Sequence, residues 1–231
     1  MKTRIAKFIA ESGVASRRVA EDLVARGAVS VNGKKIDSPV FFVDSGDVVV
    51  VNGKKVTTDT KTKLYAFHKP INTMTTRIDP AGRKTIYDCL PDAYKNLKYI
   101  GRLDYKTTGL LLLTNDGEFA RKMTLPSTKI PRTYIATIYG TLSKIDSARR
   151  GITVDGVKYA PMKIDILDNK NLRIEIVEGK KNEIRIVLGA CGANVKKLHR
   201  IAYGQIELDD LQIGQIREIK QKVIDVIKKS F

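Results

Sequence analysis

The most informative segment of the chain reads Tyr99-Ile-Gly-Arg-Leu-Asp-Tyr-Lys-Thr-Thr-Gly-Leu-Leu-Leu-Leu-Thr-Asn-Asp-Gly117. Leu110 to Leu113 is an unbroken apolar run, which is typical of a strand buried on both faces. Just ahead of it, Arg102 and Asp104 fall in a glycine-flanked turn that such a strand would hold rigidly. A carboxylate beside an arginine stays ionised near neutral pH, as a nucleophile or base requires. Asp104 is therefore our candidate catalytic residue.

Two other interpretations of Asp104 stay open at this point. Most aspartates in loops only cap a turn, and physical chemistry alone favours that role here. A glycoside hydrolase would use Asp104 together with a second acid such as Asp79 or Asp116, but that chemistry depends on a carboxyl separation that the sequence does not supply.

The segment before residue 57 predicts a small helix-helix-sheet module. Residues 5–27 carry two short apolar faces separated by Ser12-Gly13, and Ser16 and Gly27 are placed to cap and to end the second helix. Short β-rich runs follow, around the hairpin turn Asn32-Gly33.

A polar stretch from Thr57 to Lys63 lacks apolar periodicity and marks a linker. We therefore expect two domains, residues 1–60 with the linker and residues 61–231. In the second domain, short β-rich runs alternate with helical patterns, such as Gly117 to Thr124 and Ile184 to Cys191, but not in a regular strand-helix-strand order. This predicts an α+β fold on a mainly antiparallel sheet with flanking helices.

The composition points to a polyanionic partner. The 231 residues include 42 Lys and Arg against 25 Asp and Glu, a net charge of +17, and such a field attracts nucleic acid. Cys89 and Cys191 have neither a metal-ligand nor a redox spacing, so we expect reduced thiols and no metal. No secretion signal and no apolar stretch long enough for a bilayer occurs in the sequence, which favours a cytoplasmic protein without membrane contact.

The central segment also resembles a known family. Gly101-Arg102-Leu103-Asp104, followed by Thr108-Gly109-Leu110-Leu111-Leu112 and Asn115-Asp116-Gly117, is similar to the central motif of the RsuA-type ribosomal RNA pseudouridine synthases. The resemblance covers almost the whole chain. Residues 1–56 resemble the S-four RNA-binding domain, and further similar motifs are Phe67-His68-Lys69-Pro70, Pro131-Arg132-Thr133-Tyr134, Glu178 to Arg185 and Arg200 to Gly204.

This resemblance implies three catalytic roles. Asp104 would be the nucleophile or base, Tyr134 would stack on the target base, and Arg185 would pair with Asp104. Without the resemblance, Tyr134 could equally be a core aromatic on a strand. Arg185 could equally be a solvated helix arginine.

Basic residues in both domains are candidate RNA contacts. Lysines and arginines contact phosphates more often than they take part in chemistry. The predicted RNA-binding set is Lys2, Arg4, Arg17, Arg18, Lys69, Arg102, Lys180 and Lys181.

The implied function is isomerisation of a specific uridine to pseudouridine in ribosomal RNA by a bacterial enzyme. The basic motif and the ending Arg200 to Leu208 look closer to the RluB branch, which acts on the 23S RNA of the large subunit. Two departures from the family pattern are Asn72, where glycine is usual, and Ile186, where a second arginine is frequent. The reaction requires base flipping but no cofactor. We expect a monomer. The alternative is a non-catalytic ribosome assembly factor on a synthase scaffold.

Overall fold

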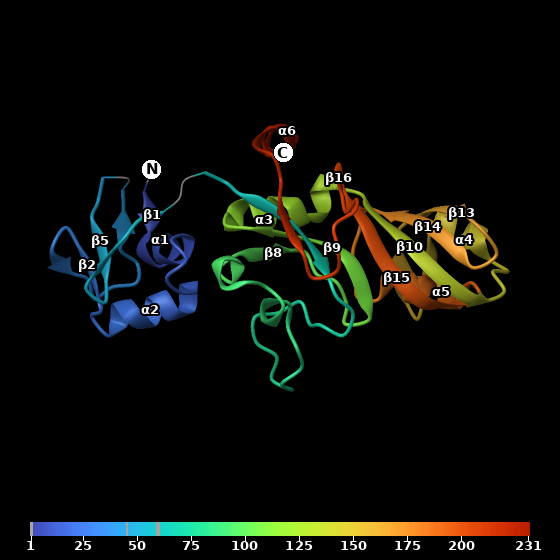
Figure 1. Cartoon of the computed structure of the whole chain (residues 1–231), viewed down its shortest axis with the longest axis horizontal. Helices are drawn as coiled ribbons and strands as arrows, with labels where there is room; N and C mark the ends of the chain where they lie inside the picture. The colour runs from blue at the N-terminus through green and yellow to red at the C-terminus, as the bar shows by residue number, and fades with distance from the viewer. Residues whose placement is uncertain (1, 45, 59–60) are drawn as a thin grey trace. The chain divides into compact units, whose positions relative to one another are not determined.

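The chain forms two compact units, one up to Thr62 together with Asn115–Gly117, the other from Lys63–Thr114 and Glu118–Phe231. A computed structural model describes residues 2–44, 46–58 and 61–231. The predicted domain boundary after Thr60, with linker residues Asp59 and Thr60, lies outside these described residues. Figure 1 draws both units, with the first in blue and cyan.

In the first unit, two helices pack on small antiparallel sheets. Ser16 caps the second helix as predicted, because its hydroxyl accepts a hydrogen bond from the Val19 N–H at 3.3 Å. Strands β3, β2, β5 and β6 pair in that order, and β1 pairs with β4. The elements are β1 (Thr3–Arg4), α1 (Ile5–Glu11), α2 (Arg17–Ala25), β2 (Val29–Val31), β3 (Lys34–Lys35), β4 (Phe42–Val43), β5 (Val49–Val51) and β6 (Lys54–Val56).

The second unit is built on one large sheet. Its strand order is β13-β14-β10-β15-β9-β7-β17, with β16 beside β15 and β8 beside β9. Every pair in this sheet is antiparallel except β9 with β15, which confirms the mainly antiparallel prediction. The strands are β7 (Leu64–Lys69), β8 (Lys98–Ile100), β9 (Thr107–Thr114), β10 (Arg132–Gly140), β13 (Lys163–Ile166), β14 (Asn171–Ile176), β15 (Ala193–Tyr203), β16 (Ile206–Glu207) and β17 (Ile216–Glu218), with a separate hairpin of β11 (Ile152–Val154) and β12 (Val157–Tyr159).

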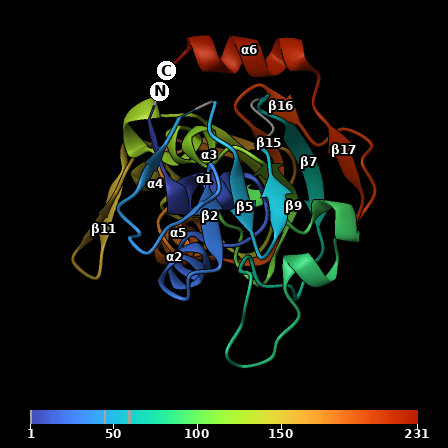
Figure 2. The ribbon, with the colours of Figure 1, turned by 90° about the vertical axis from the view of Figure 1, so that its left-hand side faces the viewer.

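Helices cover both faces of this sheet. On one side lie α3 (Gly117–Thr124) and α6 (Gln221–Lys229), and on the other α4 (Ile145–Arg150) and α5 (Glu183–Ala190). Figure 2 gives the second view of this arrangement. The unit also contains short 3₁₀ turns, η1 (Ile86–Asp88), η2 (Asp92–Tyr94) and η3 (Pro126–Thr128).

The predicted buried strand lies near the centre of the sheet as β9. Leu110 and Leu112 belong to the core under α3 and α6, whereas Leu111 and Leu113 belong to the opposite core. All four side chains are fully buried. Successive strand residues point to opposite faces, so an unbroken apolar run is what a strand with two covered faces needs.

Gly109 permits the one parallel pairing in this sheet. It lies opposite Arg200 with a φ of +104°, and a Cβ atom there would lie 2.2 Å from the Arg200 carbonyl oxygen. Only glycine fits so close an approach at this φ. The pairing brings the end of the predicted catalytic turn beside β15.

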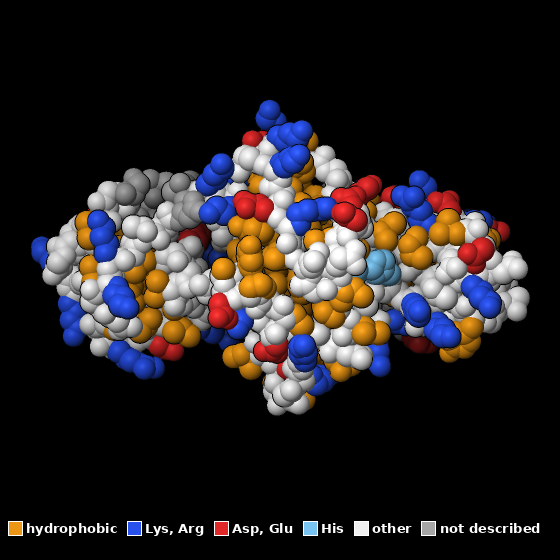
Figure 3. All heavy atoms as spheres, in the orientation of Figure 1, with side chains coloured by type: hydrophobic (Ala, Val, Ile, Leu, Met, Phe, Trp, Pro, Cys, Tyr) orange, Lys and Arg blue, Asp and Glu red, His pale blue; other side chains and the backbone are white. Residues whose placement is uncertain are grey.

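Within the described residues, no helix combines the length and the apolar character needed to span a bilayer. Figure 3 shows lysine and arginine side chains spread over the visible face of both units.

Candidate active site

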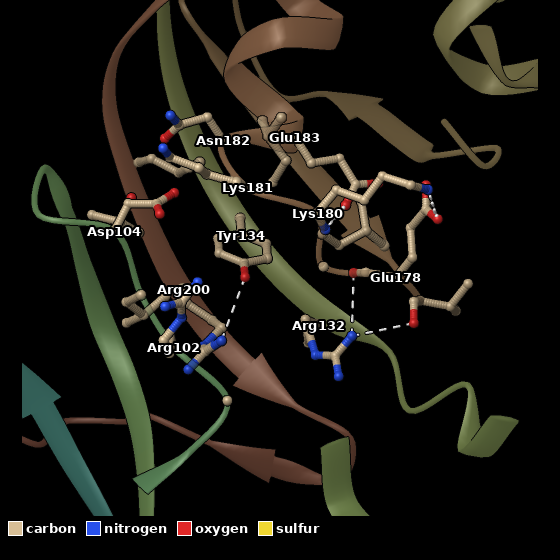
Figure 4. Close-up of a pocket in the computed structure, with 18 of the residues that line it drawn as sticks. Arg102, Asp104, Arg132, Tyr134, Glu178, Lys180, Lys181, Asn182, Glu183 and Arg200 are labelled. Atoms are coloured by element: carbon tan, nitrogen blue, oxygen red, sulfur yellow. Dashed lines mark hydrogen bonds and ion pairs between the residues drawn. The ribbon is translucent and has the colours of Figure 1, made fainter. Parts of the chain in front are cut away.

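A cavity of about 580 Å³ opens in the second unit where several segments meet. They include the turn Gly101 to Asp104, strand β10, the loop that precedes α5, and strand β15. This volume is typical of a small-molecule site. Figure 4 shows the side chains that line it, with Asp104 at one side and Tyr134 beside it.

Asp104 is held at the cavity by its backbone rather than by its side chain. Its carbonyl accepts a hydrogen bond from the Thr107 N–H at 2.9 Å, and the next carbonyl, of Tyr105, accepts one from Asn72 at 2.9 Å. The Thr75 hydroxyl fixes the other side of the turn by donating to the Leu103 carbonyl at 2.8 Å. The Asp104 side chain is exposed and makes no hydrogen bond or ion pair with a described residue. Its carboxylate is therefore free to meet a substrate.

Asn72 occupies a turn position at which the family pattern has glycine. Its φ is +57°, a left-handed conformation that asparagine tolerates better than most residues.

Tyr134 lies near the start of β10, between β14 and β15, and lines the same cavity as Asp104. It is 7% exposed, and its hydroxyl accepts a hydrogen bond from Arg200 Nη1 at 3.5 Å. The structure thus brings Asp104 and Tyr134, which lie on separate segments, to one cavity.

Arg185 does not form the predicted ion pair with Asp104. Its Nη1 donates to the Val195 carbonyl at 2.7 Å and its Nη2 to the Lys106 carbonyl at 3.2 Å. These contacts bind α5 to β15 and to the end of the catalytic turn. Burial lowers the pKa of the guanidinium and the Asp104 charge raises it, and both residues line a second cavity of about 390 Å³. The prediction of direct pairing was wrong, because the guanidinium donates its hydrogen bonds to backbone carbonyls instead.

Lys69 is not available to RNA. Its side chain is fully buried, and the ammonium donates to backbone carbonyls inside the second unit. The prediction of an RNA contact was wrong, because no part of this lysine reaches the surface in this structure.

The other predicted basic residues are exposed. Arg102, Lys180 and Lys181 line the cavity, and Lys180 pairs with Glu178. Those of the first unit lie at its surface, namely Lys2, Arg4, Arg17 and Arg18.

Arg200 is a cavity residue that the sequence reasoning missed. It is 1% exposed, its Nε donates to the Leu110 carbonyl at 2.6 Å, and its Nη2 has no hydrogen-bond partner among the described residues. The available signal was the alternation of β15, which places residue 200 on the same buried face as its neighbours two positions away. A guanidinium on that face needs hydrogen-bond partners. Leu198 and Ala202, two residues to either side, are buried as well.

The loop before α5 contains two neighbouring carboxyls. The Glu178 carboxylate accepts a hydrogen bond from the Ala160 N–H at 2.6 Å. Figure 4 shows the second bond, which Arg132 donates to the Glu178 backbone carbonyl at 3.2 Å. Glu183 is 3% exposed, and one of its oxygens accepts from the Lys180 N–H at 2.9 Å, while the other has no hydrogen-bond partner in the described part of the chain. Burial, with a smaller contribution from the Glu178 carboxyl, raises the pKa of Glu183 to about 7 against the opposing effect of the Lys180 N–H.

This raised pKa predicts a pH-dependent stability. Because folded Glu183 holds its proton to about pH 7 and the unfolded residue only to about pH 4.5, its contribution falls as pH rises between those values. Glu183→Gln should therefore increase the free energy of unfolding at pH 8, by at most about 3–4 kcal/mol at about 1.4 kcal/mol per pKa unit. Urea unfolding at pH 5 and pH 8 measures the effect.

Glu207→Gln, at an exposed position on β16, is the matched control and should keep the wild-type pH dependence. Equal behaviour of the two variants would contradict the assignment to Glu183.

Across the described residues, no group of three or more His, Cys, Asp and Glu side chains is placed to hold a metal ion.

The chain is similar to known proteins over almost its whole length. A family model described as RNA pseudouridylate synthase matches residues 63–190, and an S4 domain model matches residues 3–49. A ribosomal large subunit pseudouridine synthase B of Bacillus subtilis is 38% identical over 224 residues, 94% of this chain and 91% of that protein. An uncharacterized RNA pseudouridine synthase of Rickettsia conorii is 40% identical over 227 residues, 96% of this chain and 98% of that protein. A crystal structure of a pseudouridylate synthase matches with a TM-score of 0.69 at 29% identity, covering 96% of this chain and 98% of that one.

Proposed function

Because this chain belongs to the RNA pseudouridylate synthase family, we propose that it isomerises a uridine of 23S large-subunit ribosomal RNA, with Asp104 as the catalytic carboxylate. The observation that carries the proposal is the exposed, unpaired Asp104 carboxylate beside Tyr134 in one cavity. The choice of the large subunit rests on the Bacillus subtilis relative, whose name assigns it to that subunit.

The reaction breaks the C–N glycosidic bond, turns the uracil and joins it to the same ribose through carbon. Atoms and electrons balance without a co-reactant. Asp104 acts on the nucleotide in one of three ways, by attacking the sugar, by adding to the base or by removing a ribose proton. Each of them needs the carboxylate charge, which the absence of a side-chain partner leaves available.

A base that is stacked in RNA cannot reach this cavity, so the nucleotide must be flipped out of its helix. In this proposal the Tyr134 ring stacks on the flipped base. The exposed residues Arg102, Lys180 and Lys181 at the cavity contact the neighbouring phosphates.

The test of the function is a mass-neutral change of uridine in transcripts of both ribosomal RNAs. We expect pseudouridine in the 23S transcript and none in the 16S transcript. Release of free uracil would instead indicate a hydrolase, and binding without any change of the RNA would indicate an assembly factor. Modification of the 16S transcript alone would overturn the subunit assignment and leave the chemistry intact.

Stacking predicts different effects for two substitutions at Tyr134. Tyr134→Phe keeps the ring and should keep most of the binding of the flipped nucleotide. Tyr134→Ala should lose about 1–3 kcal/mol, the usual value of one base stacked on an aromatic side chain. The dependence of the single-turnover rate on enzyme concentration measures this binding. Tyr139→Ala, at an exposed position on the same strand, is the control, and an equal loss in the Phe and Ala variants would refute stacking.

The first unit supplies affinity in this proposal, through phosphate contacts of its exposed basic residues. Arg17 and Arg18 lie in the first turn of α2. Replacing both with alanine should weaken RNA binding and lower the slope of log K against log salt by about one for each lost contact. The matched control replaces the exposed residues Lys158 and Lys163 of the second unit. An unchanged slope in the Arg17 and Arg18 variant would show that this face does not touch RNA.

A further inference from the structure

Lys69, the last residue of β7, is a buried ammonium bound only to backbone carbonyls. Its Nζ donates to Pro70 at 3.0 Å, to Thr107 at 3.0 Å and to Asp104 at 3.4 Å. The side chain is fully buried, and no carboxylate of a described residue forms an ion pair with it. Removing an ammonium from water without an anionic partner is costly, so these three carbonyls must compensate for its lost hydration.

One of these carbonyls belongs to Asp104, which ends the turn Gly101 to Asp104, and another belongs to Thr107, which begins β9. The Thr107 N–H also donates to the Asp104 carbonyl at 2.9 Å. The ammonium therefore links the carbonyls of Asp104 and Thr107 to β7 by hydrogen bonds, while the Asp104 side chain lines the cavity. Lys69 also pairs with Gly109 in the β7–β9 ladder, which fixes the backbone of the lysine beside the first residues of β9.

We infer, on the basis of the proposed function, that Lys69 is a positioning residue that sets the backbone of the Asp104 turn and so aims the catalytic carboxylate. It does not contact the substrate. An arrangement of this kind affects the rate of the chemical step more than RNA affinity, because catalytic groups must be held within about half an ångström of their productive geometry.

The protonation state of Lys69 gives the inference a second readout. The pKa of its ammonium is lowered to about 8, mainly by burial and to a smaller extent by the Arg200 charge. The nearby Cys89 and Asp104 oppose this shift. Above that pH the neutral amine has one fewer N–H donor for the three carbonyls. The turn should then loosen, and the single-turnover rate of the wild-type enzyme should fall as pH rises through about 8.

The experiment compares wild type, Lys69→Met and Lys69→Gln in the full-length protein. We expect the Met variant to lose at least tenfold in single-turnover rate at pH 7, with RNA affinity within about twofold of wild type. We expect the Gln variant, which keeps N–H donors but does not titrate, to be intermediate in rate. Neither variant should show the decline above pH 8. Lys222→Met, an exposed position on α6, is the control.

Amide hydrogen exchange of residues 103–108 tests the same inference without any substrate. We expect exchange there to become at least tenfold faster in the Met variant, with exchange in β11 and β12 unchanged. If the Met variant does not fold, wild type alone should show faster exchange in this segment above pH 8, beyond the ordinary pH dependence seen in β11 and β12. Unchanged exchange, or a loss of RNA affinity that matches the loss of rate, would overturn the inference. Absence of pseudouridine with wild type would refute the proposed function instead.

Discussion

Replacing Asp104 with asparagine should abolish isomerisation while leaving folding and RNA affinity nearly unchanged. The carboxylate is exposed and has no side-chain partner among the described residues, so the amide breaks no contact of the folded chain. The shape of the turn depends on backbone groups, which the substitution keeps. What disappears is the charge that attacks or removes a proton.

Single-turnover conversion of radiolabelled uridine, together with a filter-binding measurement of RNA affinity, separates these two expectations. Asp165→Asn, at an exposed position on β13, is the matched control and should react as wild type does. A rate above a few percent of wild type in the Asp104 variant would remove Asp104 from the chemistry. Loss of affinity in proportion to the rate would make it a binding residue.

Gly109→Ala should strongly destabilise the large sheet of the second unit. The added Cβ would lie 2.2 Å from the Arg200 carbonyl oxygen and 2.7 Å from its nitrogen. Both are backbone atoms of a paired strand, so they cannot move aside as a flexible side chain would. We expect a loss of more than about 4 kcal/mol in the free energy of unfolding, a size reserved for severe overlaps in a core. Catalysis should fail as well, because β9 and β15 carry the Asp104 turn and Arg200.

Gly156→Ala is the control, because Gly156 also has a positive φ, +77°, but no atom within 4 Å of the added Cβ. That variant should lose only the conformational preference of glycine, about 1–2 kcal/mol. Urea unfolding of both variants gives the comparison. Similar losses in the two would show that backbone conformation, and not the overlap with Arg200, sets the cost at Gly109.

Local pattern was enough to predict several elements of this fold. The four leucines of β9 form a strand with two covered faces, and the predicted helix at Gly117 to Thr124 is α3 without a shift of either end. The predicted helix from Ile184 begins one residue earlier, as α5. These features depend on a few consecutive residues, and periodicity reports them directly.

The partners of buried charges could not be predicted in this way. Arg185 was matched to Asp104 through the family resemblance and Lys69 to RNA through its charge, but the structure gives both of them backbone carbonyls. Which acceptor lies within reach is decided only after distant strands have paired. Arg200 depends on the same pairing, since its Nε donates to Leu110, 90 residues away along the chain.

The parallel pairing of β9 with β15 also sets an order of events during synthesis. The catalytic turn emerges from a ribosome long before its neighbouring strand, and domains generally fold as units as they emerge. On the edge of β9 that faces β15, strand β8 pairs with residues 112–114, but residues 107–109 have no neighbouring strand until residue 200 has been made, which is a hazard for aggregation. Nascent chains stalled before β15 should therefore depend on chaperones, and the carboxylate site becomes complete only after β15 has been made.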